Sequence, residues 1–153
     1  MKNSSEYIYI DARGDWWYEG NRIIHPEVLK LFKSSLQVDP ENGQLKISYK
    51  GREAPVKVEK TPFFVQDIAV DRNPEGELER IELLLDDESR EELDPATLTL
   101  DADGILQVRV KEGAFAALCL PTAHFRLAEL FSEDGAGGFT LELAGRSWPV
   151  AHR

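Results

Sequence analysis

The chain has 153 residues, of which 42% are apolar, 9% aromatic and 30% charged. This size and composition predict one folded domain, or two small halves that share a core, and they argue against a disordered chain. The net charge of −10 disfavours nucleic acid as a partner, because an acidic surface repels phosphate groups.

The sequence also bears on location and cross-linking. No apolar run approaches the roughly 20 residues that span a bilayer, and the first residues lack the apolar core of a secretion signal. We therefore expect a cytoplasmic protein without a membrane partner. The single cysteine, Cys119, excludes an intrachain disulfide, and its apolar neighbours indicate a buried, unreactive thiol with a raised pKa.

Residues 7–60 carry the pattern of two strands, a helix and a hairpin. The helix has His25 at its N-cap, Pro26 at its first position and an apolar stripe that extends to Leu36. In chain order the predicted elements are a strand over 7–10, a turn over 11–15, a strand over 16–18, the helix, a half-buried strand over 44–50, a tight turn at Gly51 and a returning strand that includes Val56 and Val58.

Residues 61–104 are rich in acid and have no second copy in the chain. Between Glu75 and Asp103 stand twelve Asp and Glu residues against two arginines. Their spacing is not that of an EF-hand, so we expect no calcium site and interpret the acids as a solvated face that could steer a basic partner. The predicted elements are strands over 63–70 and 78–85, joined by a hairpin loop over 73–76, and a short strand over 98–100.

Residues 105–151 repeat the first segment in order and spacing, with His124 matching His25 and Gly145 matching Gly51. The predicted elements are a strand over 106–110, an apolar run over 114–120, a helix capped by Thr122 with a stripe that extends to Phe131, a strand over 139–143 and a returning strand over 148–150. The sequence thus predicts an α+β fold. Two repeated hairpin–helix–hairpin units with mainly antiparallel sheet are joined by a β-rich middle segment.

Several stretches follow one another in an order that resembles a known family. They are Ile10–Gly20 (IDARGDWWYEG), the helix that contains Leu31 and Phe32, Val56–Phe63 (VKVEKTPF), Leu106–Gly113 and the helix after Pro121. Together they are similar to the bacterial DUF1285 family, whose name denotes a domain of unknown function. The resemblance implies a mixed α and β fold with repeated structural motifs. It also implies a ligand-binding role linked to signalling.

The densest aromatic cluster is Trp16-Trp17-Tyr18. Alternation along a strand places Trp16 and Tyr18 on one face of the sheet and Trp17 on the other. Two adjacent tryptophans are difficult to bury in a small domain, so a binding platform is one interpretation. Ordinary core packing with one aromatic at the rim is the other.

Three further residues are candidates for ligand contact. His25 stands at a predicted helix start. Together with His124 it would be a weak metal site, because zinc takes three or four ligands. Arg52 follows a turn glycine, where it could clamp a carboxylate or simply be solvated. Phe63 begins the first predicted strand of the middle segment. We expect neither a metal nor a cofactor.

The sequence contains no nucleophile elbow, phosphate loop, dinucleotide fingerprint or zinc-protease motif. We therefore expect a non-catalytic module that binds a small molecule or a peptide in a cleft between the repeat units, lined by the aromatic cluster, His25, Arg52 and Phe63. The alternative is a structural or interaction protein that forms a homodimer through exposed strands. A hydrolase that uses clustered carboxylates is the third possibility.

Overall fold

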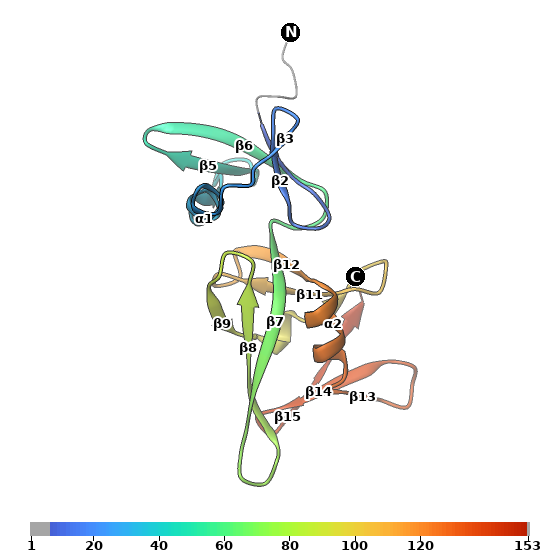
Figure 1. The fold of residues 1–153 in the computed structure, drawn as a ribbon. Coiled ribbons are helices and arrows are strands. Elements are labelled where there is room, and N and C mark those ends of the chain that lie inside the picture. Colours follow the sequence, from blue (N-terminus) through green and yellow to red (C-terminus); the bar gives the residue numbers. More distant parts are fainter. Residues whose placement is uncertain (1–6, 153) are drawn as a thin grey trace. The chain divides into compact units, whose positions relative to one another are not determined.

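The computed structural model describes residues 7–152, and the chain divides into two compact units after Pro62. Unit 1 runs up to Pro62, and unit 2 begins at Phe63 (Figure 1). Almost all of the predicted middle segment, 61–104, therefore folds in the same unit as residues 105–151. Within residues 7–152, neither helix has the length and apolar character needed to cross a membrane.

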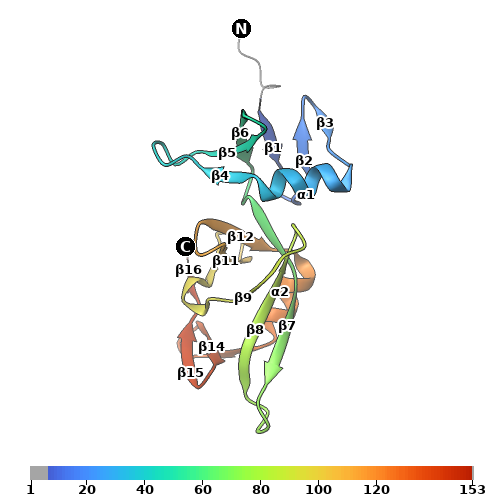
Figure 2. The ribbon, with the colours of Figure 1, turned by 90° about the vertical axis from the view of Figure 1, so that its left-hand side faces the viewer.

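Unit 1 is a six-stranded sheet with one helix, in the strand order β3-β2-β1-β6-β5-β4 (Figures 1 and 2). The β1–β6 pairing is parallel and the other pairings are antiparallel. The elements are β1 (Ile8–Ile10), β2 (Trp16–Tyr18), β3 (Asn21–Arg22), α1 (Pro26–Ser34), β4 (Leu36–Val38), β5 (Leu45–Tyr49) and β6 (Arg52–Val58).

One face of this sheet forms the core of unit 1. Its buried side chains alternate along the strands with half-buried or exposed ones, as period-2 geometry requires. Phe32 of α1 stacks on Trp16 with ring centroids 6.5 Å apart, so the helix packs on this face. The buried set is Ile8, Ile10, Trp16, Leu36, Ile47 and Val56.

Unit 2 combines a seven-stranded sheet, in the order β16-β10-β11-β12-β7-β8-β9, with the three-stranded sheet β13-β14-β15. Helix α2 packs against β7 (Figure 1). The elements are β7 (Phe63–Arg72), β8 (Leu78–Leu85), β9 (Arg90–Glu92), the short 3-10 helix η2 (Pro95–Thr97), β10 (Thr99–Leu100), β11 (Leu106–Val110), β12 (Phe115–Cys119), α2 (Pro121–Ala128), β13 (Phe131–Glu133), β14 (Phe139–Leu143), β15 (Arg146–Pro149) and β16 (Ala151–His152).

The α+β class is confirmed, since two helices accompany sheets that are mostly antiparallel. The predicted helix ends are wrong. Helix α1 ends at Ser34, where the hydroxyls of Ser34 and Ser35 both donate to the carbonyl oxygen of Leu31 at 2.8 Å and compete with the backbone. Leu36 instead begins β4 and is buried in the sheet.

The start of the second helix also differs from the prediction. Pro121 takes the first helical position and extended Leu120 the N-cap, so Thr122 lies inside α2 and His124 does not match His25. Phe131 lies in β13 and matches Leu36 of β4. Phe131 pairs with Leu141, the central residue of β14, and Leu36 pairs with Ile47, the central residue of β5. The same number of residues separates each helix-starting proline from this strand residue.

One type of hairpin turn recurs in both units. In four turns an Asp or Asn at the first position pairs through its backbone N–H with the carbonyl four residues on, while its side chain accepts a backbone N–H within the turn. A glycine with positive φ occupies the fourth position of each. The four turns span 11–15, 73–77, 101–105 and 134–138.

A fifth turn with the same backbone hydrogen bonds, over 85–89, has neither the Asp or Asn at its first position nor the glycine at its fourth. Leu85 replaces the Asp, and Glu88 adopts a φ of 71° where the other turns have glycine. The left-handed conformation is unfavourable for a side chain with a Cβ, so this turn carries backbone strain. Asp87 stabilises it instead, accepting hydrogen bonds from the backbone N–H and the hydroxyl of Ser89.

We expect Glu88→Gly to raise the free energy of unfolding of unit 2 by up to about 1 kcal/mol, because glycine relieves the strain in the folded state. Gly104→Ala, at the same position of a sister turn where an added Cβ meets no atom within 4 Å, should lower it by a similar amount. Urea unfolding of both variants measures this. A lower stability of Glu88→Gly would contradict the account.

Candidate functional site

The aromatic cluster of the sequence forms strand β2, and its members have different surroundings. Trp16 is fully buried in the core of unit 1, and Tyr18, at the end of the strand, is 42% exposed. Trp17 lies on the opposite face from Trp16, as alternation predicts, and is half-buried. Of the two tryptophans, Trp17 therefore has a ring that a ligand could reach.

The outer face of the sheet carries a row of four side chains, which we call the aromatic row: Arg22, Trp17, Tyr9 and Lys57. Arg22 pairs with Trp17, Trp17 with Tyr9, and Tyr9 with Lys57, so the row crosses β3, β2, β1 and β6 in order. Because neighbouring strands lie about 4.8 Å apart, the row spans about 14 Å. Two aromatic residues thus stand side by side with a cation at each end.

Hydrogen bonds hold both rings of the aromatic row. The indole Nε1–H of Trp17 donates to Asp11 Oδ2 at 2.9 Å, and the Tyr9 hydroxyl donates to Glu59 Oε1 at 3.1 Å. Asp11 lies two residues after Tyr9, and Glu59 lies two residues after Lys57. The indole N–H of Trp17 and the hydroxyl of Tyr9 are therefore each held by a carboxylate just beyond the end of the neighbouring strand. The rings are therefore oriented before any ligand arrives, which lowers the entropic cost of binding.

The carboxylate of Asp11 has two roles. Oδ1 accepts the backbone N–H groups of Arg13 and Asp15 and closes the turn, while Oδ2 holds Trp17. Partial burial tends to raise the pKa of Asp11, but the hydrogen bonds from Trp17 and the turn lower it below the ordinary value. The pKa of Tyr9 is raised by desolvation and by its hydrogen bond to Glu59.

The two cations of the row differ in their partners. Lys57 is exposed, and its Nζ lies 4.3 Å from the centroid of the Tyr7 ring, which adds a third aromatic residue to this face. The Arg22 guanidinium lies 3.7 Å from Asp15, an exposed and weak ion pair.

The other predicted site residues do not join this row. His25 is the exposed N-cap of α1 and makes no side-chain cap hydrogen bond. Arg52 is exposed at the β5–β6 turn, opposite Tyr49. Phe63 belongs to unit 2, where it is buried with its ring edge-to-face against Phe115 at 5.2 Å.

Sequence reasoning missed Tyr9, Arg22 and Lys57. A signal for Tyr9 was present, because Tyr7 and Tyr9 alternate with the buried Ile8 and Ile10 and must face away from the core. Nothing in the sequence indicated Lys57, since its place beside Tyr9 depends on the parallel pairing of β1 with β6, which are far apart in the chain.

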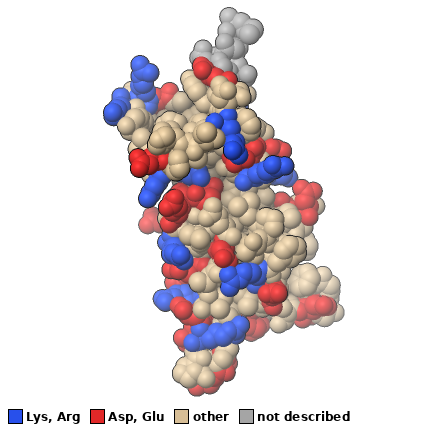
Figure 3. Space-filling model, in the orientation of Figure 1, with Lys and Arg blue, Asp and Glu red and all other residues tan. Residues whose placement is uncertain are grey.

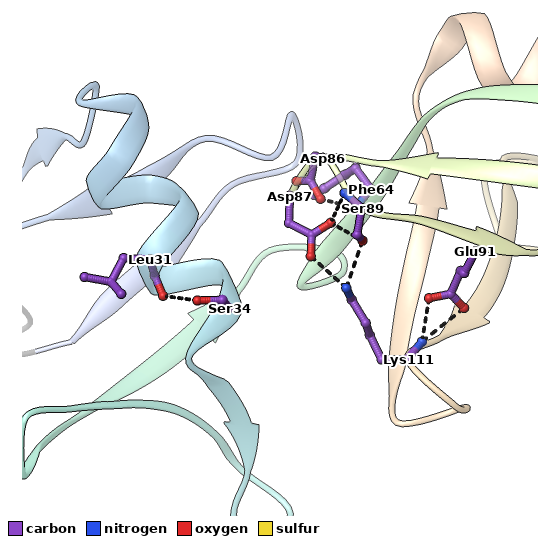
Figure 4. A network of polar contacts seen from close by, with 8 residues as sticks. All are labelled: Leu31, Ser34, Phe64, Asp86, Asp87, Ser89, Glu91 and Lys111. Carbon is purple, nitrogen blue, oxygen red and sulfur yellow. Dashed lines mark hydrogen bonds and ion pairs between the residues drawn. The ribbon is translucent and has the colours of Figure 1, made fainter.

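A second polar cluster lies in unit 2 (Figure 4). Lys111 Nζ donates to Asp87 Oδ2 at 2.7 Å and to Ser89 Oγ at 2.9 Å, and the Lys111 backbone N–H donates to the carboxylate of Glu91. A serine beside a lysine invites comparison with a nucleophile and its base. Here the carboxylate of Asp87 stabilises the charged ammonium, and Ser89 donates to that same carboxylate, so the cluster fastens the strained 85–89 turn.

Two open hollows flank the tip of the β7–β8 hairpin in unit 2, with volumes of about 670 Å³ and 590 Å³. They share Glu77, Leu78 and Gly145, and none of the candidate ligand residues predicted from the sequence is among the residues that line them. Within residues 7–152 no three His, Cys, Asp or Glu side chains gather as a metal site needs. Cys119 is buried as its apolar neighbours predicted, and burial raises the pKa of its thiol to about 12.

The bond between Asp11 and Trp17 predicts an acid titration. Ionised Asp11 accepts the indole proton, so the bond persists above the lowered pKa and is lost as the pH falls through it. We expect the indole N–H resonance of Trp17 to shift with a midpoint below 3.8, the ordinary pKa of aspartate. Asp11→Asn should abolish this transition without shifting the indole N–H resonance of Trp148, which lies in β15 of unit 2. A midpoint above 3.8 would disprove the assignment.

No family model matches the sequence, and no curated protein matches it. Two solved structures share its fold. A DUF1285 family protein from Silicibacter pomeroyi DSS-3 is 22% identical, with a TM-score of 0.75 over 94% of this chain and 78% of the other. One from Shewanella baltica OS155 is 18% identical, with a TM-score of 0.63 over 81% and 91%. The chain thus has the fold of DUF1285 family proteins, as the resemblance of its sequence implied.

Proposed function

We propose that the protein is a cytoplasmic, non-catalytic binding module for a small molecule or a peptide, and that its ligand stacks on the aromatic row. The observation that carries this proposal is the pairing of Tyr9 and Trp17 on the outer face, with both rings held by carboxylates. Aromatic side chains on a rigid sheet provide a large apolar contact area at low entropic cost. The family resemblance adds a role in signalling to the proposal.

The polar clusters support a binding role more than a catalytic one. Ser89 lies beside Lys111, but its hydroxyl donates a hydrogen bond to the carboxylate of Asp87. Cys119 is buried with a raised pKa. Neither side chain offers an activated nucleophile at neutral pH.

We further propose that the segments after the two helices arose by duplication. Each is a three-stranded antiparallel meander, β4-β5-β6 or β13-β14-β15. The turns within them match closely, with φ of 53° and 77° at Lys50 and Gly51 and of 54° and 79° at Ala144 and Gly145. The surrounding sheets differ, because β6 pairs with β1 whereas β15 ends a separate sheet.

The alternative is a structural or interaction protein that acts as a homodimer. Strand β4 forms one edge of the unit 1 sheet, and Val38 on it is 40% exposed. An edge strand with exposed backbone groups can pair with a second copy. Measuring the molar mass by light scattering tests the homodimer, since a protein that stays monomeric at all concentrations is inconsistent with it.

Binding through the aromatic row predicts that Trp17→Ala weakens every ligand found by a thermal-shift screen of metabolites, nucleotides and short peptides. We expect a loss of affinity of about tenfold, from the lost ring contact. Tyr18→Ala is the matched control, because Tyr18 is the next residue, is aromatic and exposed, and lies outside the row. Ligands that bind Trp17→Ala as tightly as the native chain would refute the proposal.

A further inference from the structure

The acidity of the chain is not shared between its units. Unit 2 contains nineteen Asp and Glu against eight Lys and Arg, a net charge of −11, whereas unit 1 contains nine against ten, a net charge of +1. Acidic and basic side chains are interspersed on the face drawn in Figure 3. The overall charge of −10 therefore gives no reason to exclude an anionic ligand from unit 1.

The charges around the aromatic row are unevenly satisfied. Asp11 is engaged by Trp17 and two backbone N–H groups, and Glu59 by Tyr9 and the backbone N–H of Ala12. Lys57, in contrast, forms no ion pair with a carboxylate of the described residues, and its contact is the face of the Tyr7 ring. The row thus ends at an exposed ammonium that no carboxylate among residues 7–152 neutralises.

We propose that the aromatic row binds a planar aromatic anion, with its ring system stacked on Trp17 and Tyr9 and its phosphate or carboxylate paired with Lys57. This inference rests on the proposed function and names its ligand class. Adjacent strands are about 4.8 Å apart, so one fused ring system is wide enough to contact both side chains. The anionic group then reaches the next strand, where Lys57 stands directly beside Tyr9.

Five probes test this ligand class against the folded, full-length chain. Adenosine 5′-monophosphate and adenosine form one pair, and indole-3-acetate and indole-3-ethanol form another, so each pair differs in its anionic group. Ribose 5-phosphate has the anion without the ring. The dissociation constant of each is measured by following the indole N–H resonance of Trp17, assigned from the spectrum of Trp17→Phe.

We expect the anion of at least one pair to bind about tenfold more tightly than its neutral partner, as a charge-assisted hydrogen bond provides. Lys57→Gln should bring that ratio close to one. Lys50→Gln is the matched control, because Lys50 is also exposed and lies over a tyrosine ring, at 5.3 Å from Tyr49, but away from the row. Preference for the monophosphate identifies a phosphate ligand, and preference for indole-3-acetate a carboxylate ligand.

Three results would overturn the inference. A ratio near one in the native chain, with both members still binding, removes the role of Lys57 and leaves the proposed function intact. Ribose 5-phosphate binding as tightly as the monophosphate removes the role of the rings. If no probe shifts the Trp17 resonance, the ligand class is wrong, and the screen with Trp17→Ala decides the proposed function separately.

Discussion

The two rings at the centre of the aromatic row, Tyr9 and Trp17, lie side by side because β1 pairs antiparallel with β2. That register sets Ile10 opposite Trp16 and Tyr9 opposite Trp17. A shift of one residue would move Trp16 to the outer face and Trp17 into the core, because side chains alternate with a period of two. One short hairpin therefore fixes both the core position of Trp16 and the outward position of Trp17.

Asp11 connects this hairpin to the site. One carboxylate oxygen closes the 11–15 turn, and the other holds the Trp17 ring. The turn over 11–15 joins the paired strands β1 and β2, and its Asp11 also orients Trp17, the tryptophan that this pairing places on the outer face. In the sister turns over 101–105 and 134–138, Asp101 and Asp134 likewise accept backbone N–H groups through Oδ1.

Local patterns predicted much of the fold. Strand β8 has the predicted bounds, and the strands at Ile8 and Trp16 follow from alternation. The helix ends did not follow, because the apolar spacing of α1 continues into β4 at Leu36, where serine hydroxyls end the helix. Of the aromatic row, the sequence analysis named Trp17 as a candidate but neither Arg22 nor Lys57, since these join the row through pairings of distant or very short strands. Trp16 and Phe63 were candidates because of their chemistry, and the core took both.

The two adjacent tryptophans have opposite environments, Trp16 in the core of unit 1 and Trp17 on the outer face of the sheet. Hydroxyl-radical footprinting of the native chain, with oxidation located by fragment mass spectrometry, tests this contrast most directly. We expect Trp17 to be oxidised in the folded protein and Trp16 to be protected until the protein unfolds. Equal oxidation of the two, or oxidation of Trp16 ahead of Trp17, would contradict it.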